Sequence, residues 1–351
     1  MAATFEQQYF TALLRGEKFP LWLNAYIETP EMQRLSGIGQ ACGCDYTALY
    51  EHAFFHTVLS HSIGVALIIW NFMRGQDERL RKCAALAGLF HDIATPTFKH
   101  CIDFLKGDHE NQEATEEQTE QLIRGDKEIM KLLARDGISV EEVCDYSLYP
   151  LADNKSPRLC ADRLDYTLMN LAYRTKAWEI EDIQQAYQDM IVLTNEDDEP
   201  EIGFKTTTIA EKYILACRHL WPTWYDNRDR ITMQFVADTL KKMVEKSFLR
   251  EDDFYKLSEC QIINKILKCK DKSISEAFKK FQAATEIFEG EMCVKDKYCI
   301  SVGSKKRWTN PLVQSGGRAK RITELSKAAK DAVRSWLEFT VPKWVWFDFD
   351  Y

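Results

Sequence analysis

The sequence predicts a mainly α-helical protein that ends in a small α+β appendage. Apolar residues recur at helical spacing through residues 1–180 and again from about residue 208 to 286. Strand-like patterns are confined to the less regular stretch 178–205 and to the chain after residue 298. With 351 residues, of which 45% are hydrophobic, the chain can build a large core in one or two domains.

The predicted helices of the first 180 residues are separated by short loops at residues 37–39, 107–108 and 137. Three of these helices carry a His or an Asp on an otherwise apolar stripe. The stripes are His61, Val65, Ile68 and Phe72; Leu80, Ala84, Ala87 and His91; and Leu159, Asp162, Tyr166, Met169 and Tyr173. Because apolar stripes face the core, we expect these His and Asp side chains to point inward.

Beyond residue 180 the pattern changes twice. Two apolar segments, 191–193 and 202–204, flank the acidic turn 195–200 and predict a short hairpin. After the helices that end near residue 286, residues 298–302 and 343–347 alternate like strands, with a helix at about 322–338 between them. The sequence therefore predicts a helical core at 1–180, a helical extension with a short hairpin at 181–289, and a small α+β subdomain at 290–351.

Composition and charge argue against several classes of protein. The chain has no run of 18 apolar residues and begins without the pattern of a signal peptide, so we expect no membrane association. A net charge of −8 argues against a constitutive nucleic-acid partner. Eleven cysteines without a CxxC pair favour reduced thiols and a cytoplasmic location. The basic segments 305–307 and 318–321 are expected to be solvated, with an allosteric nucleotide or RNA site as the alternative.

His61, His91, Asp92 and Asp162 are the candidate metal ligands. His91 and Asp92 are adjacent, whereas His61 comes about 30 residues earlier and Asp162 about 70 residues later. A carboxylate on a buried stripe needs a cation or hydrogen-bond donors, because burying it alone is costly. Ligands from separate helices indicate a site inside a bundle, and this mixed imidazole and carboxylate set suits Mn, Fe, Co, Ni or Zn.

The same residues carry a family resemblance. The order His61, then His91-Asp92, then Asp162 resembles the HD superfamily of metal-dependent phosphohydrolases. Residues 29–35, 61–65 and 161–166 resemble ligand-flanking segments of its deoxynucleotide triphosphohydrolase branch, and residues 307–312 resemble the C-terminal region of uncharacterised bacterial members. The resemblance implies an HD-domain helical bundle in residues 1–180. It also implies self-association, because relatives with this architecture are often dimers or higher oligomers.

Roles for further residues follow from the resemblance. His109 matches the catalytic acid–base position, as general acid or as the group that positions the nucleophile, with Glu110 or Glu113 orienting its ring. His100 is expected to contact phosphate, with a second metal ion as the alternative, and Lys99 to face solvent, with phosphate as the alternative. The other implied substrate contacts are Gln40 to the nucleoside, Tyr166 and Asn170 to the sugar, and Tyr225 and Arg228 to phosphate.

Three positions depart from the triphosphohydrolase pattern and point away from deoxynucleoside triphosphates. Val58 replaces a phosphate-gripping Arg, Asn170 replaces an Asp, and Thr95 replaces a second His. The sequence thus predicts a metal-dependent hydrolase of phosphoric esters or triphosphoric monoesters, which uses metal-activated water on a small-molecule nucleotide or related phosphoester. It leaves open that Mg²⁺ accompanies the substrate. The alternatives are a nucleotide-binding regulator with little or no catalysis and a binuclear HD phosphodiesterase.

Overall fold

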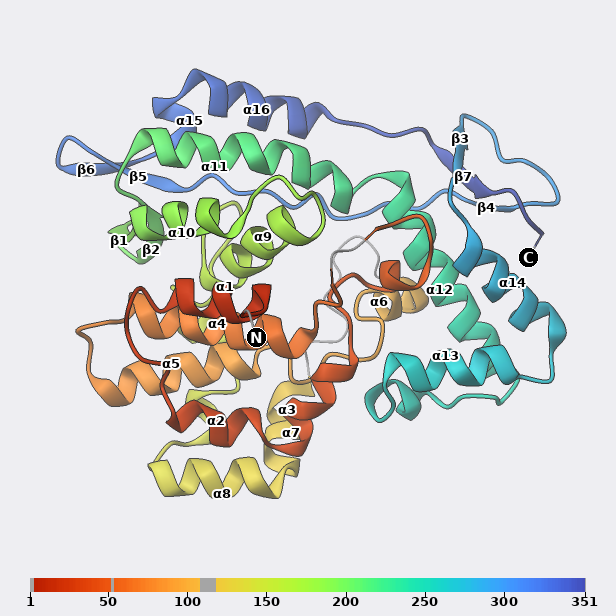
Figure 1. Cartoon of the computed structure of the whole chain (residues 1–351), viewed down its shortest axis with the longest axis horizontal. Coiled ribbons are helices and arrows are strands. Elements are labelled where there is room, and N and C mark those ends of the chain that lie inside the picture. Colours follow the sequence, from red (N-terminus) through yellow and green to blue (C-terminus); the bar gives the residue numbers. More distant parts are fainter. Residues whose placement is uncertain (1–2, 52–53, 108–117, 351) are drawn as a thin grey trace.

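The structure, a computed structural model, describes residues 3–51, 54–107 and 118–350. It confirms a mainly α-helical protein, because helices make up most of the molecule and the strands form two small sheets (Figure 1). The helices that surround those described below are α1 (Phe5–Leu13), α2 (Trp22–Ile27), α3 (Pro30–Arg34), α7 (Thr119–Gly125), α8 (Lys127–Asp136), α10 (Ile180–Asp189), α13 (Glu259–Lys268) and α14 (Lys272–Ala283).

Three helices form the centre of the helical core, and α4 packs against the other two. They are α4 (Val58–Phe72), α5 (Glu78–Phe90) and α9 (Ala161–Tyr173). α4 begins after Thr57, whose hydroxyl accepts a hydrogen bond from the Ser60 amide. Glycine allows α4 and α5 to approach closely, because a Cβ on Gly88 would lie only 2.3 Å from Ile69 Cδ1. This packing buries most of α4, including the first predicted metal ligand.

The strands form a four-stranded and a three-stranded sheet. The first has the order β1-β2-β5-β6, from β1 (Met190–Thr194), β2 (Pro200–Phe204), β5 (Leu312–Ser315) and β6 (Arg318–Arg321). The second has the order β3-β7-β4, from β3 (Phe288–Gly290), β7 (Trp344–Phe347) and β4 (Tyr298–Ile300). The predicted hairpin is confirmed, since β1 and β2 pair antiparallel with Val192 opposite Ile202. β5 pairs parallel to β2, with Leu312 opposite Gly203.

The predicted helix at 322–338 is two helices, α15 (Ile322–Leu325) and α16 (Lys327–Glu338). Ser326 separates them, because its hydroxyl accepts a hydrogen bond from the Ala329 amide and so starts α16 afresh. α16 lies along α11 (Thr207–Leu220), beside which Trp221 approaches Trp336 with ring centroids 6.3 Å apart (Figure 1).

Two apolar cores hold the chain together, and both draw on segments far apart in the sequence. The larger core surrounds α4, α9 and α11 and includes Trp336 from α16. The smaller core joins α6 (Cys101–Lys106), α12 (Asn227–Glu245) and α14, where Phe235 stacks on Phe281 at 4.6 Å. It also includes Phe347 of β7. The predicted region boundaries at 180/181 and 289/290 remain predictions, although sheets and cores cross both of them.

In the part of the chain that the structure describes, no helix combines the length and the apolar character needed to span a bilayer.

Candidate metal centre

Four side chains from three parts of the helical core converge at one point. The Nε2 atoms of His61 and His91 lie 3.2 Å apart, and Asp162 Oδ1 lies 3.1 Å and 3.8 Å from them. Asp92 Oδ2 approaches the same two nitrogens at 4.0 Å and 3.8 Å. One ligand atom each from His61, His91 and Asp92 lies within 4.8 Å of the other two. The structure therefore brings together all four predicted ligands.

The local structure explains how these side chains are delivered. His61 lies one turn into α4, His91 is the C-terminal cap of α5, and Asp92 follows it in a turn. Asp162 is the second residue of α9. The first turns of α4 and α9 and the C-terminal end of α5 thus meet at the site. Helices hold the candidate ligands more rigidly than a loop would.

Both imidazoles are oriented by their other ring nitrogen. His91 Nδ1 lies 2.7 Å from the Gly88 carbonyl oxygen, so it must carry the proton and donate it. His61 Nδ1 lies 2.7 Å from Asp165 Oδ2, and Asp165 Oδ1 accepts a hydrogen bond from the Tyr9 hydroxyl at 2.7 Å. With Nδ1 protonated, each Nε2 presents a lone pair to the point of convergence, as a metal ligand requires.

The electrostatics of the cluster fit a cation. Burial alone would lower the pKa of His61, but hydrogen bonds to Asp162 and Asp165 raise this pKa to about 9. Burial would raise the pKa of Asp92, yet Lys99 and the two ligand imidazoles hold this pKa well below its usual range. The site therefore attracts positive charge, and a divalent ion would take the place of the proton between His61 and Asp162.

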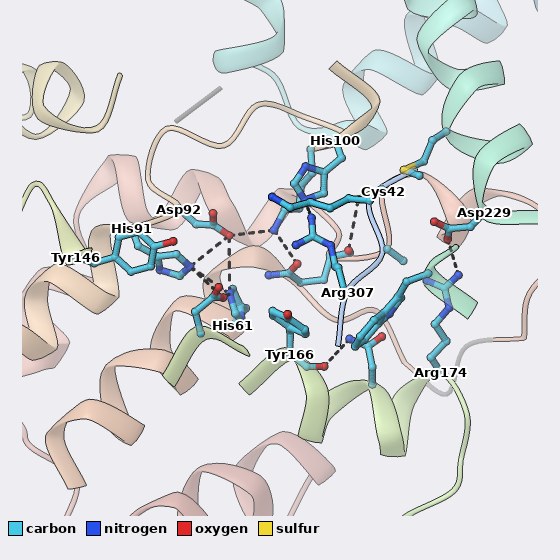
Figure 2. A pocket seen from close by; sticks show the side chains of 18 residues that line it. Cys42, His61, His91, Asp92, His100, Tyr146, Tyr166, Arg174, Asp229 and Arg307 are labelled. Carbon is cyan, nitrogen blue, oxygen red and sulfur yellow. Dashed lines mark hydrogen bonds and ion pairs between the residues drawn. The ribbon is translucent and has the colours of Figure 1, made fainter. Parts of the chain in front are cut away.

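A cavity of about 170 Å³ opens beside the cluster and contains four of the predicted substrate contacts. In Figure 2, His61, His91 and Asp92 gather on one side of the cavity, and Arg174 and Asp229 lie on the other. The lining comprises Gln40, Ala41, Cys42, His61, His91, Asp92, Lys99, His100, Tyr146, Asp162, Tyr166, Asn170, Arg174, Trp224, Asp229, Met233, Lys305 and Arg307. Gln40, His100, Tyr166 and Asn170 are thus all present.

The remaining predicted site residues lie elsewhere. Tyr225 packs its ring against Trp336 at 5.7 Å and does not line the cavity. Arg228 does not line it either, because its guanidinium lies over the Tyr50 ring at 5.9 Å. Their phosphate contacts stay predictions that this geometry does not favour. His109, Glu110 and Glu113 lie outside the described residues.

Lys99 was predicted to face solvent, and this prediction is wrong. Its Nζ lies 3.0 Å from Asp92 Oδ2 and donates to Gln40 Oε1 at 2.8 Å. Lys99 and the preceding Phe98 both have positive φ angles, 44° and 65°, which residues with side chains seldom adopt. Glu259 Oε1 accepts a hydrogen bond from the Phe98 amide at 2.9 Å and so holds this turn in place.

The prediction of a solvated face at residues 305–307 is wrong for two of the three. Lys305 and Arg307 line the cavity, and an Arg307 guanidinium nitrogen lies 3.3 Å from His100 Nε2. Only the tertiary fold brings this segment to the metal ligands, so no local pattern could have indicated it. Asp165 was also missed, although its position three residues after Asp162 on a helix was a usable signal.

The structure shows where the three residues that depart from the triphosphohydrolase pattern lie. Val58 is buried, and its amide donates to the Ile38 carbonyl at 2.9 Å. Thr95 is buried, and Arg34 donates to its carbonyl at 2.9 Å. Asn170 lines the cavity while its amide donates to the Tyr166 carbonyl at 2.7 Å. Of these three, only Asn170 borders the space where a substrate would lie.

Comparisons with known proteins find an HD domain at residues 58–167. The chain is 24% identical over 317 residues to the uncharacterized protein YdhJ of Bacillus subtilis, covering 88% of this chain and 90% of that protein. It is 25% identical over 251 residues to the metal-dependent phosphohydrolase cns2 of Cordyceps militaris, covering 67% of this chain and 65% of that protein.

The fold is similar to that in the crystal structure of a hypothetical protein from Aquifex aeolicus. The TM-score is 0.64 at 18% sequence identity, with 94% of this chain and 92% of that chain covered. The HD domain and the phosphohydrolase relative together support metal-dependent phosphohydrolase activity.

Proposed function

We propose that the protein hydrolyses a nucleotide or a related phosphoester, with one divalent metal ion held by His61, His91, Asp92 and Asp162. The observation that carries the proposal is the paired orientation of the imidazoles. Each Nδ1 is engaged by a fixed acceptor and each Nε2 faces the two carboxylates. Such an arrangement binds Mn, Fe, Co, Ni or Zn well.

A bound ion of this kind would supply a water of lowered pKa and would polarise a phosphoryl oxygen. The chain's own residues would complete the reaction. Lys99, which lies 3.0 Å from Asp92, places a positive charge beside the ligands, where negative charge develops during phosphoryl transfer. His109 is proposed as the proton donor to the leaving oxygen, with Glu110 or Glu113 orienting it.

A nucleoside-like leaving group is supported by the rest of the lining. Tyr166 packs edge-on against Trp224, with ring centroids 5.3 Å apart, and offers an aromatic surface beside the metal ligands. Gln40 keeps its Oε1 on Lys99, while its buried Nε2 finds no hydrogen-bond partner among the described residues. An amide donor at this position suits a carbonyl or ring nitrogen of a bound base.

The structure favours the mononuclear reaction over the binuclear alternative. His100 would be the additional ligand, but its Nδ1 lies 2.8 Å from Asp103 Oδ2 and its Nε2 lies 3.3 Å from Arg307. Both ring nitrogens therefore face protein groups. The triphosphohydrolase branch stays a prediction. Val58 and Asn170 lead us to expect poor turnover of ordinary deoxynucleoside triphosphates unless another basic residue replaces the missing phosphate contact.

A phosphatase screen would test this function. Metal-stripped protein is reloaded with each candidate ion and assayed on nucleoside mono-, di- and triphosphates, with the product identified as phosphate, pyrophosphate or tripolyphosphate. We expect phosphate release that depends on the added ion and disappears in Asp162→Asn. A protein that binds metal stoichiometrically but releases nothing from any of these compounds would favour the non-catalytic regulator.

A further inference from the structure

We infer that Arg307, together with Lys99 and Lys305, forms a phosphate-binding wall of the cavity, with Arg307 as its anchor. The inference rests on the proposed function and names the group that the site holds, a phosphate dianion beside the metal. Arg307 would supply the positive charge that the triphosphohydrolases place at the position of Val58.

The segment that carries Arg307 is fixed at both ends and at two points between them. Residues 301–311, here called the strap, run between β4 and β5, which belong to different sheets. Lys306 turns away from the cavity and donates to the carbonyls of Leu337 and Phe339 at the end of α16, at 2.7 Å each. Further along, the Asn310 amide donates to the Pro157 carbonyl at 2.7 Å.

This anchoring explains why the two neighbours of Lys306 point inward. In extended chain, successive side chains alternate between opposite sides. With Lys306 held by α16, Lys305 and Arg307 take the opposite side and line the cavity. Figure 2 shows Arg307 reaching between His100 and Tyr166. The orientation of Lys305 and Arg307 therefore follows from the anchoring of Lys306 on α16.

His100, backed by the buried Asp103, also orients the Arg307 guanidinium. His100 Nδ1 lies 2.8 Å from Asp103 Oδ2, a carboxylate with no exposed surface, and is the protonated nitrogen. His100 Nε2 is then an acceptor, and the guanidinium donates to it at 3.3 Å. Burial lowers the pKa of His100, which agrees with a neutral ring in this role. Asp103 and His100 are thus positioning residues for Arg307.

The charge of the lining suits a phosphate. The described lining carries four cationic side chains, Lys99, Arg174, Lys305 and Arg307, and three carboxylates, Asp92, Asp162 and Asp229. Arg174 and Asp229 pair with each other at 2.5 Å, away from the ligand cluster. A divalent ion bound to Asp92 and Asp162 would make the net charge of this lining strongly positive. A guanidinium binds phosphate through two parallel, charge-assisted hydrogen bonds, which the planar fork of Arg favours.

Binding of inorganic phosphate to the metal-loaded protein would test the wall, measured by isothermal titration calorimetry. Arg307→Gln is expected to weaken phosphate binding at least about tenfold, and Arg307→Lys to weaken it less, since it keeps the charge and loses the fork. Arg318→Gln is the matched control, because it removes the same charge from exposed β6, outside the cavity. Arg307→Gln should also raise KM more than it lowers kcat on any substrate found.

The outcome is separable from that of the proposed function. If the wild-type protein hydrolyses no phosphoester but Arg307→Gln still weakens phosphate binding, the proposed function is wrong and the phosphate-binding wall is supported. Unchanged phosphate binding in Arg307→Gln, with metal content and thermal unfolding like the wild type, overturns the wall. Weakened phosphate binding in Arg228→Gln but not in Arg307→Gln would instead assign phosphate binding to Arg228, as the sequence predicted.

Discussion

Asp165 is the residue whose replacement most directly tests how the metal site is built. Its side chain is fully buried and makes two contacts of 2.7 Å, to His61 Nδ1 and to the Tyr9 hydroxyl. Asp165→Asn keeps an oxygen acceptor and the volume, but it removes the charge that favours the required tautomer of His61. Loss of such a partner typically costs 10–100-fold in metal affinity, so we expect about 1.4–2.7 kcal/mol.

A second substitution should produce the same defect from the opposite helix. A Cβ on Gly64 of α4 would lie 1.9 Å from Asp165 Oδ1, where ordinary contacts begin at 3.4 Å. Gly64→Ala must therefore move that carboxylate by about 1.5 Å, the difference between these two distances. A displacement of this size would break the 2.7 Å contact with His61 Nδ1. We expect Gly64→Ala to lose at least as much metal affinity as Asp165→Asn.

The assay is competition for Zn²⁺ or Mn²⁺ against a chromogenic chelator, with circular dichroism to confirm folding. Asp136→Asn is the matched control, because Asp136 also accepts a tyrosine hydroxyl, from Tyr26 at 2.8 Å, but contacts no metal ligand. Wild-type metal affinity in a folded Asp165→Asn protein would refute the reasoning. Equal losses in Asp165→Asn and Asp136→Asn would show that the effect is general destabilisation.

Three further predictions concern metal, catalysis and pH. Asp92→Ala should remove the single metal ion without unfolding the protein, and full occupancy by elemental analysis would contradict the ligand assignment. His109→Ala should keep the metal and lose roughly 10²–10⁴-fold in turnover, so a metal-free variant or unchanged turnover would exclude the acid–base role. Burial raises the pKa of Glu259 from its ordinary 4.5 to about 8, so the folded state alone keeps this proton between these values. The free energy of unfolding should therefore fall by about 2.5 kcal/mol between pH 5.5 and 7.5, and Glu259→Gln should flatten this dependence in denaturant titrations; an unchanged dependence of stability on pH in that variant would refute the assignment.

The convergence of the candidate metal ligands was predictable because three of the four, His61, His91 and Asp162, lie on apolar helical stripes that face the core. His61 and Asp162 stand on apolar helical stripes, and a buried polar residue on such a stripe requires a partner. The hairpin at residues 190–204 was predictable for a similar reason, because its apolar segments flank an acidic turn. These patterns need only a few consecutive residues to be recognised.

Features that depend on distant contacts were not predictable. Nothing near Lys305 and Arg307 shows that α16 holds Lys306 and turns its neighbours toward His100. Lys99 looked like a surface residue because its inward direction follows from a left-handed turn, which Glu259 stabilises from 160 residues away. The break at Ser326 was missed because periodicity continues across it, whereas its capping hydroxyl starts a new helix.

The strap has a consequence for the order in which the protein matures on the ribosome. Asp162 completes the ligand set, and Arg307 follows about 145 residues later. At ~5–20 residues per second, synthesis leaves roughly 7–30 s in which the ligands have been made and the strap has not. Because the strap pairs into a different sheet at each end, Lys305 and Arg307 join the cavity only after the later segment has docked. The candidate metal ligands are therefore synthesised before the basic wall of the cavity, and an ion could bind them before a phosphate could be held.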